Sequence, residues 1–504
     1  MDEQLLKLQN GSDIRGVALE GVEGENVNLT PSIANRIGQA FAQWLSAKTK
    51  KSADQLKVGI GMDSRISGQN LMIGVSAGLI ANGVDVKCCG LATTPAMFMS
   101  IVFEQSQFDG SVMITASHLP FNRNGIKFFT KDGGLEHEDI TEILNIADGK
   151  EEALVDVSQE QNFDLIYLYA RHLRTSIMNG VGNYQKPLEG LKIIVDAGNG
   201  AGGFFAEKVL KPLGANIEGS QFLDPDGRFP NHIPNPENKE AMESIRQAVL
   251  ASRADLGLIF DTDVDRMSAV LDDGSEINRD AIIAMISAIL APNNKGATII
   301  TDSVTSDRLT FFLERVLGLK HLRYMRGYKN VINKQKELCA QGENAPLAME
   351  TSGHGALKEN YFLDDGAFLA VQLVIALANA AKKGKKLQSL IERLPPPGDE
   401  LELRFKINAE NFKEYGKEVL ATFAERARDA GCTIPESFEG IRLSFKGGPE
   451  ADGAEGWMLL RLSLHDPVMP LNIEGTTPGS LEKIKHVAAL LLQGFDKLDM
   501  SVLD

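Results

Sequence analysis

The chain has few cysteines, few basic residues relative to acidic ones, and no long uninterrupted apolar run. Its 504 residues include four cysteines, and none of them forms a CxxC pair. They therefore indicate reduced, buried thiols and a reducing compartment. The longest apolar stretch, residues 367–381, is interrupted by Gln372 and Asn379, so it predicts a core helix and not a membrane span. The acidic N-terminus does not resemble a secretory signal.

The deficit of positive charge narrows the class of partner. Lysine and arginine total 52 against 68 aspartate and glutamate, which gives a net charge of −16. This balance opposes binding to nucleic acid or to an anionic membrane surface. We therefore expect neither as a partner. An anionic small molecule would need a local basic cluster within this acidic chain.

A repeated pattern indicates α/β architecture. A β-rich run that ends in aspartate, then a small polar loop and then a helical pattern, occurs at residues 56–63, 191–196 and 297–302. Three such units predict three successive α/β domains with mixed sheets. Beyond the linker at Pro395–Gly398, alternating strands and a final amphipathic helix predict a smaller α+β domain with an antiparallel sheet. The predicted domains are 1–185, 186–292, 293–396 and 397–504.

A polar loop after the first domain's apolar run at residues 111–115 contains a candidate nucleophile. Thr115-Ala-Ser-His-Leu-Pro120 follows this run, which reads as a buried strand, so the loop is expected at the strand's C-terminal edge. Ser117 has His118 beside it and Lys127 ten residues further on. A hydroxyl in such surroundings can carry a covalent group.

An acidic loop supplies a candidate metal site. Asp261, Asp263 and Asp265 follow the apolar run at residues 256–260 at alternate positions. On an extended loop, alternate side chains point the same way, so their oxygens can converge on one hard cation, and Mg²⁺ suits such ligands. Arg266 can neutralise charge but cannot give up its proton. A serine loop with an acidic metal loop suggests phosphoryl transfer through a phosphoserine.

Two later loops carry candidate substrate-binding groups. Glu350 and Ser352 follow another apolar run and could hold vicinal hydroxyls, while Arg461, Ser463 and His465 share one side of an edge loop that suits a phosphate. Glu350 or Ser352 could instead be an ordinary turn residue. The stretch Gly198–Gly203 fits GxGxxG and leaves a dinucleotide-dependent oxidoreductase open.

Taken in order along nearly the whole chain, these loops resemble the α-D-phosphohexomutase superfamily, and phosphomannomutase/phosphoglucomutase most closely. The stretch 115–127 (TASHLP…NGIK) resembles its phosphoserine loop TASHNP…NGxK, 261–266 its metal loop DGDGDR, and 461–467 its phosphate loop RxSxTEP. Further similar stretches are Ser12–Gly16 (DIRG), Gly61–Arg65 (GxD(T/S)R), Pro225–His232 (PDGxFPNH), Gly327–Lys329 (G-(aromatic or His)-K) and Glu350–His354 (ExSGH).

The resemblance implies an α/β fold of four domains around a central cleft, three of them related mixed-sheet domains and the fourth a smaller C-terminal α+β domain. It also implies a mutase that interconverts hexose 1-phosphate and hexose 6-phosphate, for glucose and/or mannose. Phosphorylated Ser117 would form a hexose 1,6-bisphosphate intermediate, which is also the expected activator.

The resemblance further assigns roles to single residues. Mg²⁺ would be held by Asp261, Asp263, Asp265 and a phosphoserine oxygen at Ser117. The catalytic residues would be Ser117, Lys127, Arg15 and His118, with Lys127, near Arg15, as a proton shuttle. Substrate would be bound by eight residues, of which Glu350 and Ser352 would hold sugar hydroxyls and Lys329, Arg461 and Ser463 the phosphate that does not react. The other three are Arg266, His354 and His465.

The chain departs from the family pattern in several loops. Leu119 replaces an asparagine, Thr262 and Val264 replace glycines, and Leu464 with His465 alters the phosphate loop. The altered loop keeps open a diverged non-catalytic or regulatory sugar-phosphate-binding relative. Such variants resemble a plant and algal plastid-type subgroup, so the expected cytoplasmic location has chloroplast stroma as its alternative, after removal of a transit peptide. Both a monomer and a homodimer remain open.

Overall fold

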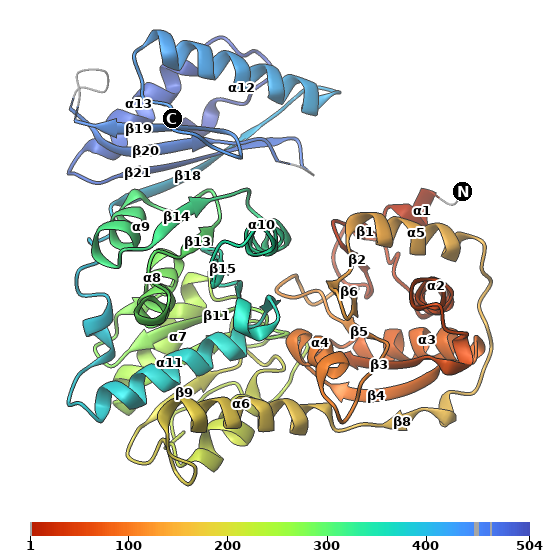
Figure 1. The fold of residues 1–504 in the computed structure, drawn as a ribbon. Helices are drawn as coiled ribbons and strands as arrows, with labels where there is room; N and C mark the ends of the chain where they lie inside the picture. The colour runs from red at the N-terminus through yellow and green to blue at the C-terminus, as the bar shows by residue number, and fades with distance from the viewer. Residues whose placement is uncertain (1–2, 448–452, 464–465, 504) are drawn as a thin grey trace. The chain divides into compact units, whose positions relative to one another are not determined.

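The computed structural model describes residues 3–447, 453–463 and 466–503. They form two compact units, one of residues Met1–Asn278 with Ser352–Ser389 and the other of Arg279–Thr351 with Leu390–Asp504. Figure 1 shows the order of the elements along the chain. Each unit is described in turn.

The first sheet is mixed and contains the serine loop at the end of a central strand. Its strands lie in the order β1-β2-β6-β5-β3-β4-β8, with β7 beside β6. Strand β3 runs parallel to β4 and β5, whereas β6 is antiparallel to both β5 and β2. The strands are β1 (Gln9–Asn10), β2 (Asp13–Val17), β3 (Lys57–Met62), β4 (Asp85–Leu91), β5 (Gly110–Ile114), β6 (Arg123–Thr130), β7 (Gly133–Gly134) and β8 (Gln161–Asn162). The apolar run predicted as a buried strand is β5, which is buried throughout.

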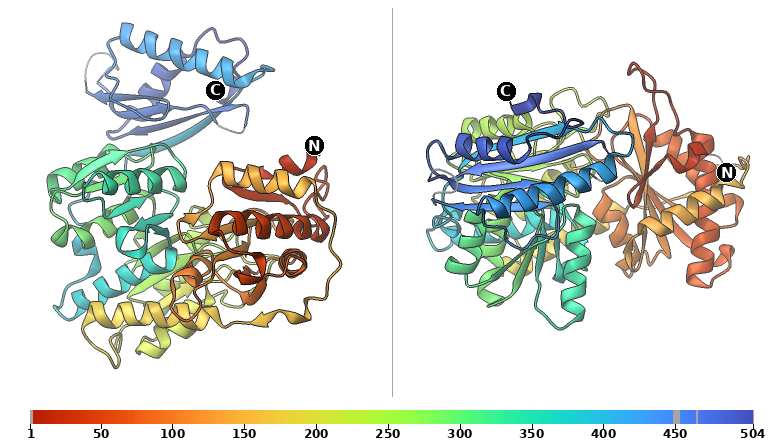
Figure 2. Two further views of the ribbon diagram at one scale, coloured as in Figure 1. Left: turned by 45° about the vertical axis from the view of Figure 1, so that its right-hand side comes forward. Right: turned by 90° about the horizontal axis from the view of Figure 1, so that it is seen from above.

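The helices of this part pack closely because glycines face the neighbouring backbone. They are α1 (Glu3–Leu6), α2 (Pro31–Thr49), α3 (Gly68–Ala81), α4 (Thr94–Val102) and α5 (His137–Asp148). Helix α2 begins where the Thr30 side chain accepts a hydrogen bond from the Ile33 N–H, with proline in the first turn. A Cβ on Gly78 of α3 would lie 2.1 Å from the carbonyl oxygen of Asn35 in α2. Figure 2 shows α2 and α3 from two further directions.

The second sheet places the acidic loop at the end of a fully buried strand. Its order is β12-β11-β10-β9, with β9 and β10 parallel and β10 and β11 antiparallel. Its elements are β9 (Ile193–Asp196), α7 (Lys239–Ser252), β10 (Leu256–Phe260), β11 (Met267–Leu271) and β12 (Glu276–Ile277). The hairpin β16 (Gly355–Leu357) and β17 (Leu363–Asp364) belongs to the same unit. Helix α6 (Leu165–Val181) lies beside α11 (Gly366–Ala381), the long apolar stretch of the sequence (Figure 1).

The second unit contains two groups of strands. In the first, β14, β13 and β15 lie side by side and parallel. Its elements are α8 (Arg279–Leu290), β13 (Thr298–Thr301), α9 (Asp307–Phe311), β14 (Lys320–Arg323), α10 (Tyr328–Ala340) and β15 (Leu347–Met349). The second is an antiparallel sheet in the order β18-β21-β20-β19. Helices α12 and α13 cover one of its faces (Figures 1 and 2). Its elements are β18 (Asp399–Lys406), α12 (Phe412–Asp429), β19 (Ile441–Lys446), β20 (Glu455–Leu460), β21 (Val468–Gly475) and α13 (Ser480–Leu491).

These elements confirm the predicted fold class, which is α/β with three mixed-sheet domains and a further C-terminal β-rich domain. The boundaries placed at residues 185/186, 292/293 and 396/397 stay a prediction. All four cysteines are free thiols. Among the described residues, no helix is long and apolar enough to cross a membrane.

The contact between α2 and α3 gives a stability prediction. Gly78→Ala should lower the free energy of unfolding by about 1–3 kcal/mol, because its methyl group would overlap the backbone of α2. Gly149→Ala is the control, since its Cβ would lie 3.8 Å from the Ile146 carbonyl oxygen and its φ is −86°. Thermal and urea unfolding measure both variants. If Gly78→Ala lowered the free energy of unfolding no more than Gly149→Ala does, the two helices would be able to move apart at little cost.

Candidate active site

Ser117 lies in the loop after β5 with its side chain buried and its backbone in the left-handed region, at φ 50°. Its N–H donates to Thr115 Oγ1 at 2.9 Å, and Thr115 Oγ1 donates to Asp63 Oδ2 at 2.7 Å. The Ser117 hydroxyl donates to Asp261 Oδ2 at 2.9 Å and lies 3.3 Å from Nδ1 of His118. A hydroxyl has one proton, so with that proton directed at Asp261, the contact with His118 needs the imidazole as donor.

One arginine holds this loop in place. The Arg65 guanidinium is buried, and its Nε lies 3.3 Å from Asp63 Oδ2. It donates to the carbonyl oxygens of Ser117 (2.5 Å), Leu119 (2.6 Å), Pro120 (2.8 Å) and Arg123 (2.9 Å). Burial lowers the pKa of Arg65, but an arginine stays protonated in proteins. The sequence contains Asp63 and Arg65 in its Gly61–Arg65 motif, yet nothing local shows that they hold the serine loop.

The acidic loop brings its carboxylates together through a turn, not along an extended loop as predicted. Val264 has φ 68°, a left-handed backbone that is costly for a β-branched residue. Lys127 Nζ lies 2.8 Å from Asp265 Oδ2 and 3.3 Å from Asp263 Oδ2. Thr94, at the start of α4, donates its hydroxyl to Asp263 Oδ2 and its N–H to the Asp263 carbonyl. No motif in the sequence pointed to Thr94.

The charges of this loop fit a bound cation. One carboxylate oxygen from each of Asp261, Asp263 and Asp265 lies within 4.8 Å of the others, and all three residues are buried. Burial and repulsion by Asp265 and Asp263 raise the pKa of Asp261 well above its ordinary value. Burial also acts to raise the pKa of Asp265, but Lys127 holds it below its ordinary value. Within the described chain, Asp263 Oδ1 and Asp265 Oδ1 are buried and have no hydrogen-bond partner. The loop could therefore hold a metal ion through these oxygens.

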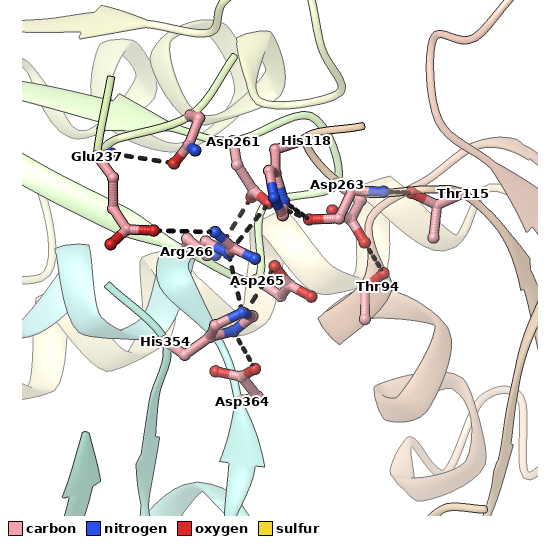
Figure 3. A network of polar contacts seen from close by, with 12 residues as sticks. Thr94, Thr115, His118, Glu237, Asp261, Asp263, Asp265, Arg266, His354 and Asp364 are labelled. Atoms are coloured by element: carbon pink, nitrogen blue, oxygen red, sulfur yellow. Dashed lines mark hydrogen bonds and ion pairs between the residues drawn. The ribbon is translucent and has the colours of Figure 1, made fainter. Parts of the chain in front are cut away.

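Arg266 and His354 extend the network on the other side of the loop (Figure 3). The Arg266 N–H donates to Asp261 Oδ1 at 3.2 Å, and its Nε donates to His354 Nε2 at 2.8 Å. The imidazole Nδ1 lies 2.5 Å from Asp364 Oδ2, and Arg266 Nη1 lies 3.7 Å from Glu237. Arg266 thus contacts an aspartate of the acidic loop directly. Asp364 and Glu237 had no motif that would have identified them.

Arg15 and His118 complete the first group. Arg15 donates to Asp13 Oδ2 at 3.1 Å and to the Ala116 carbonyl at 3.4 Å, so it contacts the segment that carries Ser117. It lies on β2, opposite Gly125 of the strand that carries Lys127. Burial and the charges of Arg266 and Arg15 lower the pKa of His118 to about 2, so its imidazole is neutral.

The second unit contains the other predicted binding residues. The Gly327 N–H donates to Glu350 Oε1 at 2.6 Å, and Lys329 lies in the first turn of α10. Arg461 follows β20, is buried, and pairs with Glu439 at 3.2 Å. The Ser463 hydroxyl accepts from the Asp466 N–H at 3.2 Å, whereas His465 lies outside the described residues. Ser352 belongs to the first unit, where its buried Oγ has no hydrogen-bond partner among the described residues.

The glycine-rich stretch at 198–203 has a structural explanation. A Cβ on Gly200 would lie 2.7 Å from the Thr262 backbone, and one on Gly203 would lie 2.2 Å from the Leu223 carbonyl. These glycines therefore allow the chain to pack against itself next to the acidic loop. The stretch gives no separate support for a dinucleotide site.

Comparison with known proteins agrees with this fold. Models of phosphoglucomutase/phosphomannomutase α/β/α domains I, II and III match residues 6–154, 168–274 and 278–397. A phosphoglucomutase of Neisseria meningitidis serogroup B is 30% identical over 94% of each chain. A phosphomannomutase/phosphoglucomutase of Pseudomonas putida is 29% identical over 94% of this chain and 93% of its own. The crystal structure of a phosphoglucomutase/phosphomannomutase family protein from Burkholderia thailandensis is 26% identical with a TM-score of 0.77, covering 99% of this chain and all of its own.

The chain belongs to the phosphoglucomutase/phosphomannomutase family of the α-D-phosphohexomutase superfamily. It is a phosphohexomutase, an enzyme that transfers a phosphoryl group within a hexose phosphate.

The hydrogen bonds of Arg65 predict a role in holding the serine loop. Arg65→Lys should lower turnover at least about tenfold and destabilise the protein by roughly 2–4 kcal/mol, because an ammonium cannot satisfy these buried carbonyls. Steady-state kinetics and thermal unfolding measure the two effects.

Arg36→Lys is the control that separates a loss of protein stability from a displacement of the serine loop. Arg36 donates to the carbonyls of Ala147 and Asp148, away from the serine loop. This variant should lose stability and retain turnover. If Arg65→Lys retained wild-type turnover as well, Arg65 would be needed for folding alone.

Proposed function

We propose that this phosphohexomutase interconverts the 1-phosphate and 6-phosphate of glucose and/or mannose through a phosphoserine at Ser117. The observation that carries the proposal is the hydrogen bond from the Ser117 hydroxyl to Asp261, a member of the buried acidic triad. A nucleophilic oxygen next to a cation site is the arrangement that phosphoryl transfer requires. Ser117 would give its phosphoryl group to the sugar, form the hexose 1,6-bisphosphate, and take back the other phosphate. The same bisphosphate would serve as activator.

Asp261, Asp263 and Asp265 would hold Mg²⁺ together with an oxygen of phosphorylated Ser117. The ion, when bound, would neutralise charge on the transferred group. The fit rests on Asp263 Oδ1 and Asp265 Oδ1, which are buried and have no hydrogen-bond partner within the described chain. Arg266 would add a fixed positive charge beside Asp261.

Lys127 is the group best placed to move a proton. Its ammonium is buried and contacts Asp263 and Asp265 at the acidic loop. Once deprotonated, the neutral amine would accept the proton of the attacking sugar hydroxyl, and the resulting ammonium would return it to the sugar oxygen on the second transfer. Arg15 would support the loop and the incoming negative charge, and His118, neutral and 3.3 Å from the Ser117 hydroxyl, would orient that oxygen.

The remaining predicted residues would bind substrate. Glu350, Ser352 and His354 would contact sugar hydroxyls, and Lys329, Arg461, Ser463 and His465 the phosphate that does not react. Two of the relatives carry glucose or both sugars in their names, which supports glucose and mannose as substrates. We also propose that the predicted domain ranges 1–185, 186–292, 293–396 and 397–504 hold. The protein would be a monomer or homodimer and would bind neither nucleic acid nor a membrane. Its location would be the cytoplasm, with the chloroplast stroma as the alternative.

The nucleophile is tested by Ser117→Ala. With glucose 1-phosphate or mannose 1-phosphate, Mg²⁺ and catalytic bisphosphate, wild type should form the 6-phosphate, and the variant should lose at least about 1000-fold in turnover. Ser111→Ala is the control, because it removes a buried hydroxyl of β5 that donates to the Met97 carbonyl. Wild-type turnover in Ser117→Ala would refute the phosphoserine. Binding of hexose phosphate without turnover in wild type would favour the non-catalytic alternative.

The metal site is tested by Asp263→Asn. Loss of a charged ligand should lower turnover at least about 100-fold and weaken Mg²⁺ binding, with only partial rescue at high Mg²⁺. Asp196→Asn is the control, since Asp196 is a buried carboxylate bonded to His232 and Gln221 outside the triad. Calorimetric titration with Mg²⁺ measures binding directly. A wild-type enzyme fully active in excess chelator would refute the metal's role.

A further inference from the structure

The Glu439 carboxylate pairs with Arg461, the arginine that the proposed function assigns to the substrate's phosphate. Its Oε1 lies 3.2 Å from Arg461 Nη1. Arg461 is 8% exposed, and its Nη2 donates to Asn472 Oδ1 at 3.4 Å. Its buried Nε has no hydrogen-bond partner in the described part of the chain. The guanidinium thus pairs with the Glu439 carboxylate, and its Nε donor has no partner among the described residues.

The second oxygen of Glu439 binds two other segments of the same unit. Oε2 accepts from the Ser303 hydroxyl at 2.5 Å, after β13, and from the Arg326 N–H at 3.0 Å. Arg326 directly precedes Gly327, whose N–H donates to Glu350. One carboxylate therefore joins the phosphate loop at Arg461 to the segment that begins the Gly327–Lys329 loop.

We propose that Glu439 is an internal anion that competes with the substrate's phosphate for Arg461. This inference rests on the proposed function, in which Arg461 binds the non-reacting phosphate. Without substrate, the carboxylate keeps the buried guanidinium paired and oriented. An incoming phosphate takes over the guanidinium, which can bind it bidentately, and Glu439 keeps its bonds to Ser303 and Arg326. Glu439 therefore lowers the affinity for hexose phosphate and favours product release.

The carboxylate-to-amide exchange tests this competition. Glu439→Gln has nearly the same shape and retains an oxygen for the Ser303 and Arg326 donors, but it removes the charge. The KM for hexose 1-phosphate should fall about tenfold, as expected for loss of one charge-assisted bond. Inhibition by inorganic phosphate should strengthen by a similar factor, and kcat should not rise. Glu436→Gln, which removes an exposed charge three residues earlier, should change neither.

A double-mutant cycle separates competition from a purely structural role. Arg461→Ala should raise KM, and Glu439→Gln should then bring no gain, because the contested guanidinium is absent. A higher KM in Glu439→Gln alone would show that Glu439 only holds Arg461 in place and would overturn the proposal. A fall in KM on Glu439→Gln that persists in the Arg461→Ala background would also overturn the proposal, since it would reflect general charge repulsion between Glu439 and the substrate. An unchanged KM in Arg461→Ala would instead overturn the phosphate role of Arg461, and the inference with it.

Discussion

Buried negative charge in the turn between β10 and β11 governs the arrangement of the active site. Asp261, Asp263 and Asp265 are removed from water, where unpaired carboxylates are costly. Positive charges and hydrogen-bond donors contact the carboxylates of this turn. Lys127 arrives from the first sheet, and Arg266 from the turn itself. The hydroxyls of Thr94 and Ser117 complete the set. The serine is therefore held where a cation would complete the charge balance.

The position of Ser117 is also set by residues outside the acidic turn. Arg65 holds the serine loop through backbone carbonyls, so the loop's shape depends little on the identity of its side chains. Leu119, where the family pattern has asparagine, takes part through its backbone: its carbonyl accepts from Arg65, and its N–H donates to the Ala116 carbonyl. The Phe229 ring lies 5.3 Å from the Arg65 guanidinium, and Gly227 lies against the backbone of residues 64–66. The segment Pro225–His232 thus supports the serine loop through Arg65.

The sequence revealed those features that depend on local pattern. Apolar runs predicted β5 and β10, and the polar residues after them gave Ser117 and the acidic triad. Alternation along an extended loop predicted that Asp261, Asp263 and Asp265 lie together. They do lie together, but in a turn, because Val264 has φ 68° and a valine gives no sign of a left-handed backbone. Thr94 lies 169 residues from Asp263, and Glu439 lies 136 residues from Ser303. No local pattern connects such pairs, because folding alone brings them together.

The central proposal is that Ser117 carries the phosphate during turnover. Its most direct test is phosphopeptide mapping of the wild-type protein after incubation with hexose 1,6-bisphosphate and Mg²⁺, followed by a chase with hexose 6-phosphate. The account predicts one phosphate, on Ser117, that the chase removes at a rate compatible with turnover. A phosphate on Thr115 or His118, none at all, or one that the chase leaves in place would contradict it.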